Sequence, residues 1–232
     1  MTKYKHIFFD LDRTLWDFER NSKETFMDIY LKYNLKKIGI NNLNELFEKY
    51  QKINSDLWEK YRNGLIMKDF LNIERFYLTL KEYNIDDKKL ASKIANDYVK
   101  ISPTKTHLFP NAIEILEYLK SKNYLLHIIT NGFPEVQYIK LRNANLSKYF
   151  HEIIISEEVG YNKPSTEIFE ISLKKANAIA SQSLMIGDDP DVDILGAIRS
   201  GIDSLWMNYD KSTNLCKATY ELENLIQIKE IL

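Results

Sequence analysis

The feature that most constrains the fold is an alternation of helical and strand patterns in the second half of the sequence. After Pro103, stretches with the apolar spacing of an amphipathic helix alternate with short apolar runs typical of buried strands. The runs predicted as strands are 125–129, 153–155, 184–186 and 204–206, and the tail is predicted to be helical. Such alternation produces a mostly parallel sheet with helices on both faces. The sequence therefore predicts an α/β fold, with a Rossmann-like, three-layer parallel-sheet core.

A further strand is predicted at residues 6–9, far from the others in sequence. From residue 19 to about 101, apolar residues recur with helical spacing, and no strand pattern interrupts them. A helical block of about 85 residues is far longer than an ordinary crossover between parallel strands. The simplest explanation is a helical insertion after the first strand. We expect residues 1–15 and 105–232 to form the α/β core and residues 16–104 to form an all-helical cap.

Composition limits the classes of protein to consider. Hydrophobic residues make up 44% of the 232 residues and charged residues 28%, which favours a folded globular core over disorder. The net charge is −1, with no basic patch of the kind that binds a nucleic-acid polymer. Neither a signal peptide nor a membrane-spanning apolar stretch is indicated. With one cysteine, Cys216, no intrachain disulfide can form, and a cytoplasmic location is expected. The oligomeric state stays open.

Two carboxylates follow the first predicted strand. Asp10 and Asp12 are two residues apart in an extended segment, so both side chains can face one pocket. Neighbouring carboxylates repel unless a cation lies between them, and Mg²⁺ prefers one or two carboxylates with phosphate oxygens and water. With Thr14, they form a D-x-D-x-T string that, taken alone, is equally a polar turn with a helix cap.

Polar residues also follow the next two strands. Thr130, Asn131 and Gly132 offer a hydroxyl, an amide and free backbone N–H groups, which suit a phosphate, although a plain strand-to-helix turn has the same composition. Lys163 lies before Pro164 in the segment after the third strand. A lone lysine is usually a solvated surface charge, and its place after a strand is what makes it a candidate.

The fourth strand in the expected sheet is followed by an acidic segment. Asp188, Asp189, Asp191 and Asp193 lie within six residues directly after a buried strand. Such a concentration of carboxylates is costly unless a metal or a basic group balances it. A helix cap, for which Asp191 is the candidate, would use only one of them. In parallel α/β sheets, sites form at the carboxyl ends of strands, so all of these residues are expected at one edge.

Taken in order, these motifs make the chain resemble the haloacid dehalogenase-like hydrolase superfamily. The family's first motif is matched by Asp10, Asp12 and Thr14, its second by Thr130, its third by Lys163, and its fourth by Asp188 and Asp193. The resemblance spans the whole chain, because a helical cap after the first motif is the family's first cap class. It implies phosphoryl transfer, since the dehalogenases themselves replace the second aspartate.

The resemblance implies a mechanism and a cofactor. Asp10 would attack phosphorus and form an aspartyl-phosphate, while Asp12 would act as general acid and then as general base. Mg²⁺ would be held by Asp10, by Asp12 through its backbone carbonyl, and by Asp188. Thr130, Asn131 and Lys163 would stabilise charge on the phosphoryl oxygens. Thr14, Asp189 and Asp193 would support the site, Asp193 by orienting Lys163 or a metal-bound water; which of Asp189 and Asp193 touches the metal stays open.

Finer similarity points to one branch of the family. Residues 14–18 and 130–133 resemble the bacterial pyrimidine 5′-nucleotidases, so a nucleoside 5′-monophosphate is the expected small-molecule substrate. Arg13 departs from the smaller or less basic residues usual at its position. In the expected cap, Trp58 and Tyr61 are candidates for stacking on a base, and core packing is the alternative for both.

Two other functions stay open. The same scaffold serves sugar-phosphate phosphatases and phosphosugar mutases, although no cap signature of a mutase is present. A non-catalytic phosphate-binding or scaffold protein is a third reading, and the intact motifs argue against it.

Overall fold

The α/β part of the computed structural model, which describes residues 3–213 and 216–232, is built on one parallel sheet. Over these residues the sheet has six strands in the order β3-β2-β1-β4-β5-β6, and each pairing is parallel. Their bounds are β1 His6–Phe9, β2 Leu125–Thr130, β3 Glu152–Ile155, β4 Ser183–Gly187, β5 Asp203–Met207 and β6 Tyr220–Leu222. In the register, His6 of β1 lies opposite Leu125 of β2 and Ser183 of β4. The carboxyl ends of these strands therefore lie at one edge.

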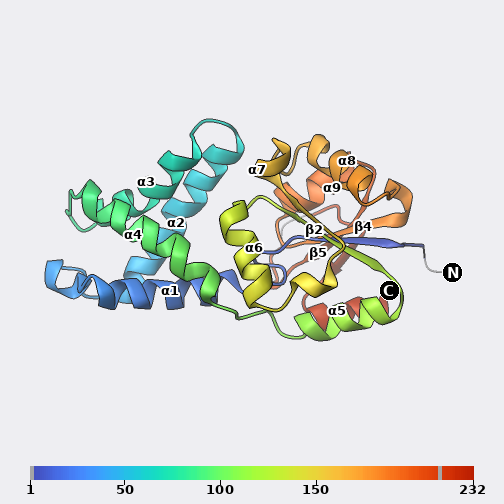
Figure 1. Ribbon diagram of the computed structural model, residues 1–232, viewed down its shortest axis with the longest axis horizontal. Helices are drawn as coiled ribbons and strands as arrows, with labels where there is room; N and C mark the ends of the chain where they lie inside the picture. Colours follow the sequence, from blue (N-terminus) through green and yellow to red (C-terminus); the bar gives the residue numbers. More distant parts are fainter. Residues whose placement is uncertain (1–2, 214–215) are drawn as a thin grey trace. The chain divides into compact units, whose positions relative to one another are not determined.

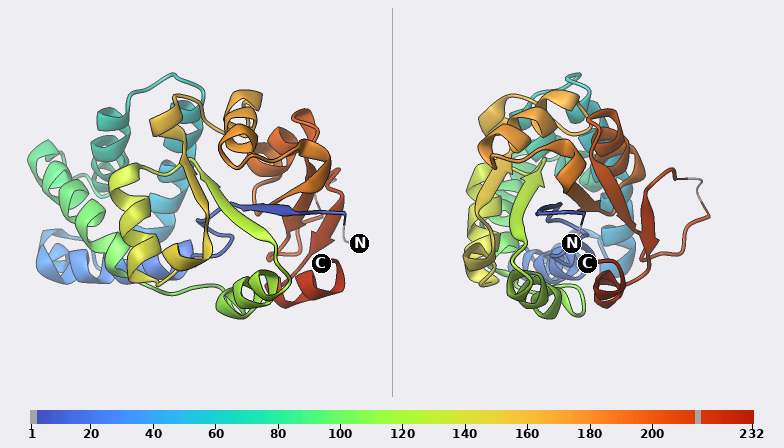
Figure 2. Two further views of the ribbon diagram at one scale, coloured as in Figure 1. Left: turned by 45° about the vertical axis from the view of Figure 1, so that its right-hand side comes forward. Right: turned by 90° about the vertical axis from the view of Figure 1, so that its right-hand side faces the viewer.

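Helices cover both faces of the sheet, as Figures 1 and 2 show. Because side chains alternate along a strand, Ile7 and Phe9 face one layer and Phe8 the other. The first layer packs on α5 (Ala112–Ser121) and on the 3₁₀ helix η6 (Leu225–Glu230), with Leu141 of α6 (Pro134–Asn143). The second layer packs on α8 (Thr166–Lys175) and α9 (Leu195–Arg199). Short helices complete this part of the chain: η3 (Ser147–Tyr149), α7 (Ser156–Val159), η4 (Ala180–Gln182) and the π-helix η5 (Pro190–Ile194).

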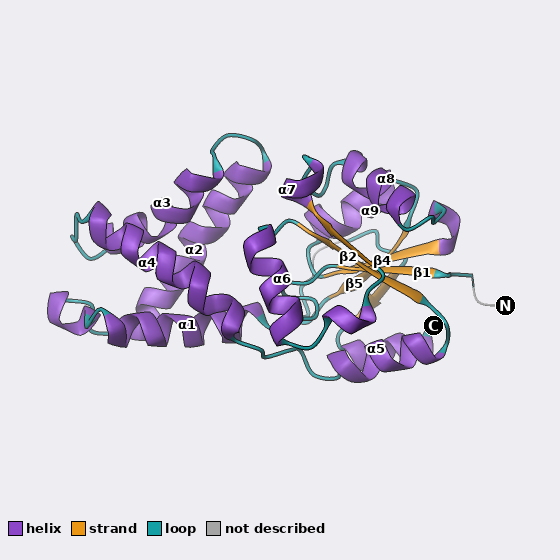
Figure 3. Cartoon of the chain, in the orientation of Figure 1, coloured by secondary structure: helices purple, strands orange, loops and turns teal. Residues whose placement is uncertain are grey.

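Residues 19–105 form a second compact unit, which is helical (Figure 3). Its elements are α1 (Phe18–Lys32), η1 (Leu35–Ile38), α2 (Leu43–Arg62), α3 (Lys68–Lys81), α4 (Lys88–Ile101) and η2 (Ser102–Thr104). An aromatic group from all four long helices fills its core: Phe26, Tyr50, Phe76 and Tyr98. Asn42 caps α2 by accepting hydrogen bonds from the N–H groups of Asn44 and Glu45. The unit therefore has its own core and its own helix signals.

The predicted fold class is confirmed: a Rossmann-like parallel sheet with helices on both faces carries a helical insertion. The division between the units falls after Phe18 and after Lys105, whereas we expected it after residues 15 and 104. Trp16 accounts for the first difference, because it is fully buried in the α/β core and bridges to Leu108. Among the described residues, no helix combines the length and apolarity needed to cross a bilayer.

The prediction of a helical tail is wrong in part. Residues Tyr220–Leu222 form β6, which extends the sheet beside β5, and the helix that follows is a 3₁₀ helix. β6 is only 3 residues long, too short for a periodic pattern to mark it. Its extended conformation depends on pairing with β5, which sequence patterns do not reveal.

Candidate active site

The residues expected from the motifs lie at the carboxyl edge of the sheet. Asp10 directly follows β1, Thr130 is the last residue of β2, and Asp188 directly follows β4. β1 lies between β2 and β4, so these three positions are neighbours. Lys163 comes from the segment after β3 and α7. The fold thus gathers residues that are up to 178 positions apart in the chain, from Asp10 to Asp188.

A buried lysine links two of the aspartates. The Nζ atom of Lys163 lies 2.6 Å from Oδ1 of Asp10 and 2.6 Å from Oδ1 of Asp193. Lys163 is 1% exposed, so it is not a solvated surface charge. Its backbone is fixed by Asn131, whose side-chain amide donates to the Lys163 carbonyl at 2.9 Å and accepts from the Lys163 N–H at 2.8 Å. Asn131 therefore positions the lysine.

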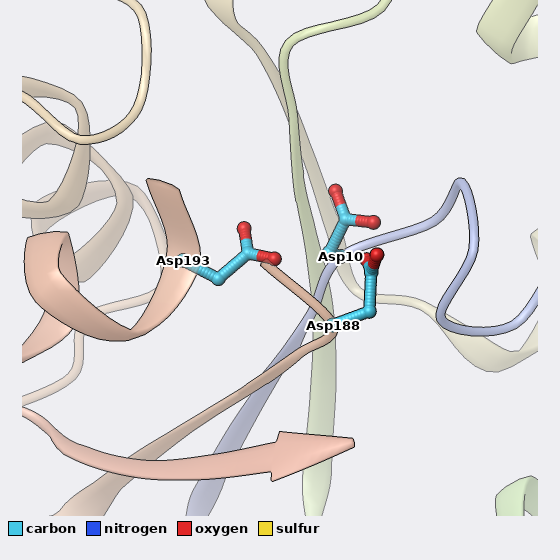
Figure 4. A group of neighbouring side chains, drawn as sticks. All are labelled: Asp10, Asp188 and Asp193. Carbon is cyan, nitrogen blue, oxygen red and sulfur yellow. The ribbon is translucent and has the colours of Figure 1, made fainter. Parts of the chain in front are cut away.

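Asp10, Asp188 and Asp193 converge on one point (Figure 4). One carboxylate oxygen from each lies within 4.8 Å of the others. Hard oxygen ligands in such a group suit Mg²⁺ or a similar divalent cation. The carboxylate of Asp12 lies outside this group and has other partners, described below. Its backbone carbonyl stays the predicted contact.

The hydrogen bonds distinguish the roles available to the three carboxylates. Asp193 uses Oδ1 for Lys163, and its Oδ2 accepts from the Asp189 N–H at 3.2 Å, so both of its oxygens are engaged. Asp188 accepts from the Thr14 hydroxyl at 3.2 Å through Oδ1, and its backbone carbonyl accepts from the Trp206 indole at 2.9 Å. These contacts fix Asp188 at the edge and give Thr14 a supporting position.

Burial and crowding shift the ionisation of the group. Burial raises the pKa of the Asp10 carboxyl to about 7, although the Lys163 ammonium opposes the rise. Burial, reinforced by the charges of Asp10 and Asp193, raises the pKa of Asp188. Burial also raises the pKa of Asp193 against the opposing effect of Lys163. Burial disfavours the charged form of Lys163, but its attraction to Asp10 and Asp193 prevails and raises its pKa. One lysine does not balance three carboxylates, and a divalent cation would.

Asp12 has partners that sequence reasoning missed. Oδ1 of Asp12 lies 2.5 Å from Nζ of Lys140, and Oδ2 accepts from the Gln137 amide at 2.9 Å. The same Gln137 nitrogen donates to the Thr130 hydroxyl at 2.7 Å. Both new residues are on α6. Only the structure reveals their burial: α6 buries Gln137 and Lys140, while its apolar Val136 and Ile139 are only half-buried.

The acidic segment after β4 contains a helix cap, but at a different residue from the one we expected. Oδ1 of Asp189 accepts from the N–H groups of Asp191 at 3.0 Å and Val192 at 3.1 Å. Asp191 is exposed and donates only through its backbone here. Gly187 makes room for this arrangement, because a Cβ there would lie 2.3 Å from a carboxylate oxygen of Asp193. Asp189 thus supports the site through the backbone.

Three further residues singled out in the sequence are Arg13, Trp58 and Tyr61. Arg13 is exposed, with a left-handed φ of 65°, and its guanidinium lies 4.9 Å from the centroid of the Phe18 ring. Trp58 and Tyr61 are half-buried on α2 of the helical unit. Their ring centroids are 5.6 Å apart and the rings are perpendicular, at 90°, so they do not present one flat stacking surface.

Comparison with known proteins agrees with this geometry. Residues 7–207 match the family described as haloacid dehalogenase-like hydrolase. The chain belongs to this family. The pyrimidine 5′-nucleotidase YjjG of Escherichia coli (strain K12) is 32% identical over 99% of this chain and 98% of that protein. The pyrimidine 5′-nucleotidase PynA of Streptococcus pneumoniae (strain ATCC BAA-255 / R6) is 30% identical over 94% of this chain and 91% of that protein.

A solved structure of the same family is also similar. The putative HAD-hydrolase YfnB of Bacillus subtilis superimposes with a TM-score of 0.90 at 28% identity, covering 100% of this chain and 99% of that chain. Its crystal structure is described as bound to magnesium and as revealing interdomain movement. Family membership and these relatives make the present chain a phosphatase of the haloacid dehalogenase-like family.

Proposed function

We propose that this phosphatase hydrolyses phosphomonoesters through an aspartyl-phosphate on Asp10. The observation that carries the proposal is the position of Asp10: a buried carboxylate at the carboxyl end of β1, paired with Lys163 and facing the carboxylates of Asp188 and Asp193. A carboxylate nucleophile forms a bond to phosphorus while the bond from phosphorus to the leaving oxygen breaks. Lys163 lies where it would neutralise charge on the transferred group.

Asp12 is the proposed acid and base. The electron pair of the broken bond stays with the leaving oxygen, which takes a proton from Asp12. Water then attacks phosphorus, gives its proton to Asp12, and releases phosphate from Asp10. Thr130 ends β2, the strand beside β1, and we propose that Thr130 and Asn131 support the phosphoryl group there.

We further propose Mg²⁺ as the cofactor. Asp10 and Asp188 fit as ligands together with the backbone carbonyl of Asp12, and Asp193, which accepts from Lys163 and from the Asp189 N–H, has the supporting role. When bound, the cation would neutralise the site and polarise a phosphoryl oxygen. The magnesium-bound structure of YfnB supports this choice of metal.

The proposed substrate is a nucleoside 5′-monophosphate, with pyrimidine bases preferred, in the cytoplasm. The two nucleotidase relatives, which align over nearly the whole chain, support this class. The phosphoryl-handling residues act on a group that all phosphomonoesters share. Selection of the leaving group therefore has to come from other residues, and we propose that the helical unit supplies them as a cap, with Trp58 and Tyr61 as the candidates.

A substrate series tests this part of the proposal. We expect kcat/KM to be highest for UMP and dUMP, lower for AMP, and lowest for glucose 6-phosphate and p-nitrophenyl phosphate. If Trp58 stacks on the base, Trp58→Ala lowers kcat/KM for UMP at least about fivefold more than for p-nitrophenyl phosphate, since stacking contributes about 1–3 kcal/mol. An equal loss on every substrate would make Trp58 a packing residue. Glucose 6-phosphate as the best substrate would overturn the nucleotidase proposal and favour a sugar-phosphate phosphatase.

A further inference from the structure

Two side chains of α6, those of Gln137 and Lys140, donate hydrogen bonds to Asp12, the proposed acid and base. Gln137 and Lys140 are three residues apart, so they share one face of the helix. Gln137 is fully buried and Lys140 is 4% exposed, whereas the side chain of Asp12 is 25% exposed. Lys140 donates to one carboxylate oxygen of Asp12 and Gln137 to the other. The plane of the carboxylate is therefore fixed from its buried side.

Lys140 is itself held in place. Its ammonium lies 4.1 Å from the centroid of the Trp16 ring as well as 2.5 Å from Asp12. A cation over an indole face is attracted to the ring, and more strongly when water is excluded. Trp16 is fully buried, so the lysine lies between a rigid ring and the carboxylate. Burying an ammonium without a partner would be strongly unfavourable, which makes Asp12 part of the reason that Lys140 can be buried.

Gln137 connects Asp12 to the end of β2. Its amide nitrogen donates both to Asp12 and to the hydroxyl of Thr130. The opposite amide orientation would place the Gln137 carbonyl oxygen against the Asp12 carboxylate, where two acceptors would face each other. Gly132 preserves the space, because a Cβ there would lie 2.4 Å from the Gln137 amide group. These contacts make the orientation of Gln137 specific.

A purely structural role does not explain this choice of residues. Apolar side chains would fill the buried face of a helix at lower cost than an amide and an ammonium. In α6 the apolar Val136 and Ile139 are half-buried instead. Both buried polar groups donate to the carboxylate of Asp12. Among the hydrogen bonds of the described residues, Asp12 is the only acceptor that the two share.

We propose that Gln137 and Lys140 are positioning residues that hold the Asp12 carboxylate to accept the proton of the attacking water. With a donor on each oxygen from the buried side, Asp12 retains acceptor capacity only toward the site. The step concerned is the second half of the reaction. Water forms a bond to phosphorus, its proton passes to Asp12, and the bond between phosphorus and the Asp10 oxygen breaks with its electron pair returning to Asp10. The inference rests on the proposed function.

The test separates the two halves of the reaction. With p-nitrophenyl phosphate, the leaving phenolate departs without protonation, so formation of the aspartyl-phosphate does not depend on Asp12. Rapid mixing then reports the first step as a burst of p-nitrophenolate and the second as the steady-state rate. We expect Lys140→Met to keep the burst rate within about twofold and to lower the steady-state rate at least about tenfold, since misplacing a catalytic group is costly. Acid-quenched Lys140→Met would then carry more phosphoryl-enzyme than the wild type.

Matched variants make the outcome decisive. Arg142→Met removes a positive charge from the exposed side of the same helix and should leave both phases unchanged. Lys140→Arg should restore part of the steady-state rate. In an Asp12→Asn background, Lys140→Met should add little, because the two residues act through one step. If Lys140→Met fails to fold, Gln137→Leu takes its place with the same expected pattern.

The results that overturn the inference are distinct from those that overturn the proposed function. Equal slowing of the burst and of the steady state in Lys140→Met, or no slowing at all, removes the positioning role. An additive loss in the double variant with Asp12→Asn does the same. Absence of any acid-stable phosphoryl-enzyme in the wild type would instead remove the covalent mechanism itself.

Discussion

At the scale of single residues, the site is a set of charges that depend on one another. Asp10 and Asp193 share one buried lysine, and Asp188 has no lysine partner among the described residues. Burial raises the pKa of all three carboxyls, which indicates that the arrangement favours a positive charge beyond that of Lys163. A divalent cation would supply that charge.

Metal removal is therefore expected to abolish turnover. After exhaustive dialysis against EDTA, the enzyme should be inactive, and added Mg²⁺ should restore the rate. Mg²⁺ at a hundred times its Kd should also stabilise the fold by about 2.7 kcal/mol, measured as a rise in Tm. Asp188→Asn should lose both effects, whereas Asp191→Asn, at an exposed aspartate of the same segment, should retain them. Full activity in excess EDTA would remove the metal from the mechanism.

A second residue-scale prediction concerns His127, which lies within β2, three residues before Thr130 and opposite Phe8 of β1. Burial, with the neighbouring charges of His6 and His151, lowers the pKa of His127 to about 3. Nδ1 of His6 lies 3.1 Å from Nε2 of His127. Below the ordinary pKa of about 6.5, the unfolded chain binds a proton at this residue and the folded protein does not. Stability is therefore present at neutral pH and is lost as the pH falls from about 6.5 toward 3.

The expected loss is about 2 kcal/mol between pH 6.5 and pH 4.5, from about 1.4 kcal/mol per pH unit reduced for incomplete burial. Urea unfolding at several pH values measures it. His127→Gln, which cannot take up the proton, should show a correspondingly flatter dependence of unfolding free energy on pH. Wild type and variant with the same slope would show that His127 does not set the acid sensitivity.

At the scale of elements, the helical segment η5 after β4 is capped by Asp189 and also carries the site residue Asp193. Asp189 caps it through two backbone N–H groups, and its own N–H donates to Asp193. Asp189→Ala should lower stability by about 1 kcal/mol, the usual cost of losing an N-cap side chain. Asp191→Ala, on the exposed neighbour, should cost much less. Chemical denaturation of both variants measures the difference, and equal costs would contradict the cap assignment.

Strands β1 to β5 and the residues that directly follow them were predictable from the sequence, whereas β6 was not. Apolar runs in the sequence indicate buried strands. The parallel topology then brings Asp10, Thr130 and Asp188 to the carboxyl edge of the sheet. The contacts of α6 were not predicted. A lysine can be expected to be buried only if its acidic partner is known, and Asp12 is 128 residues away from Lys140 in the chain. The cap at Asp189 was misassigned to Asp191, because several aspartates in one turn are equivalent by sequence alone.

At the scale of the whole molecule, the chain forms two compact units. The α/β unit contains every residue proposed to handle the phosphoryl group, and the helical unit has an aromatic core of its own. The first crossing between the units follows Phe18, and Trp16, whose ring lies against Lys140, belongs to the α/β unit. Substitutions in the helical unit should therefore change which ester is used more than how its phosphate is transferred.

The passage of the phosphoryl group through Asp10 is tested most directly by trapping the intermediate. Enzyme mixed with excess substrate for milliseconds is quenched in acid and treated with borohydride, which reduces an aspartyl-phosphate to homoserine. Mass spectrometry of the peptide that contains residue 10 should show homoserine in place of Asp10, and omission of substrate should abolish it. Asp10→Asn should give no such product and should keep less than about a hundredth of the wild-type rate. Reduction at another residue, or rapid turnover by Asp10→Asn, would contradict the account.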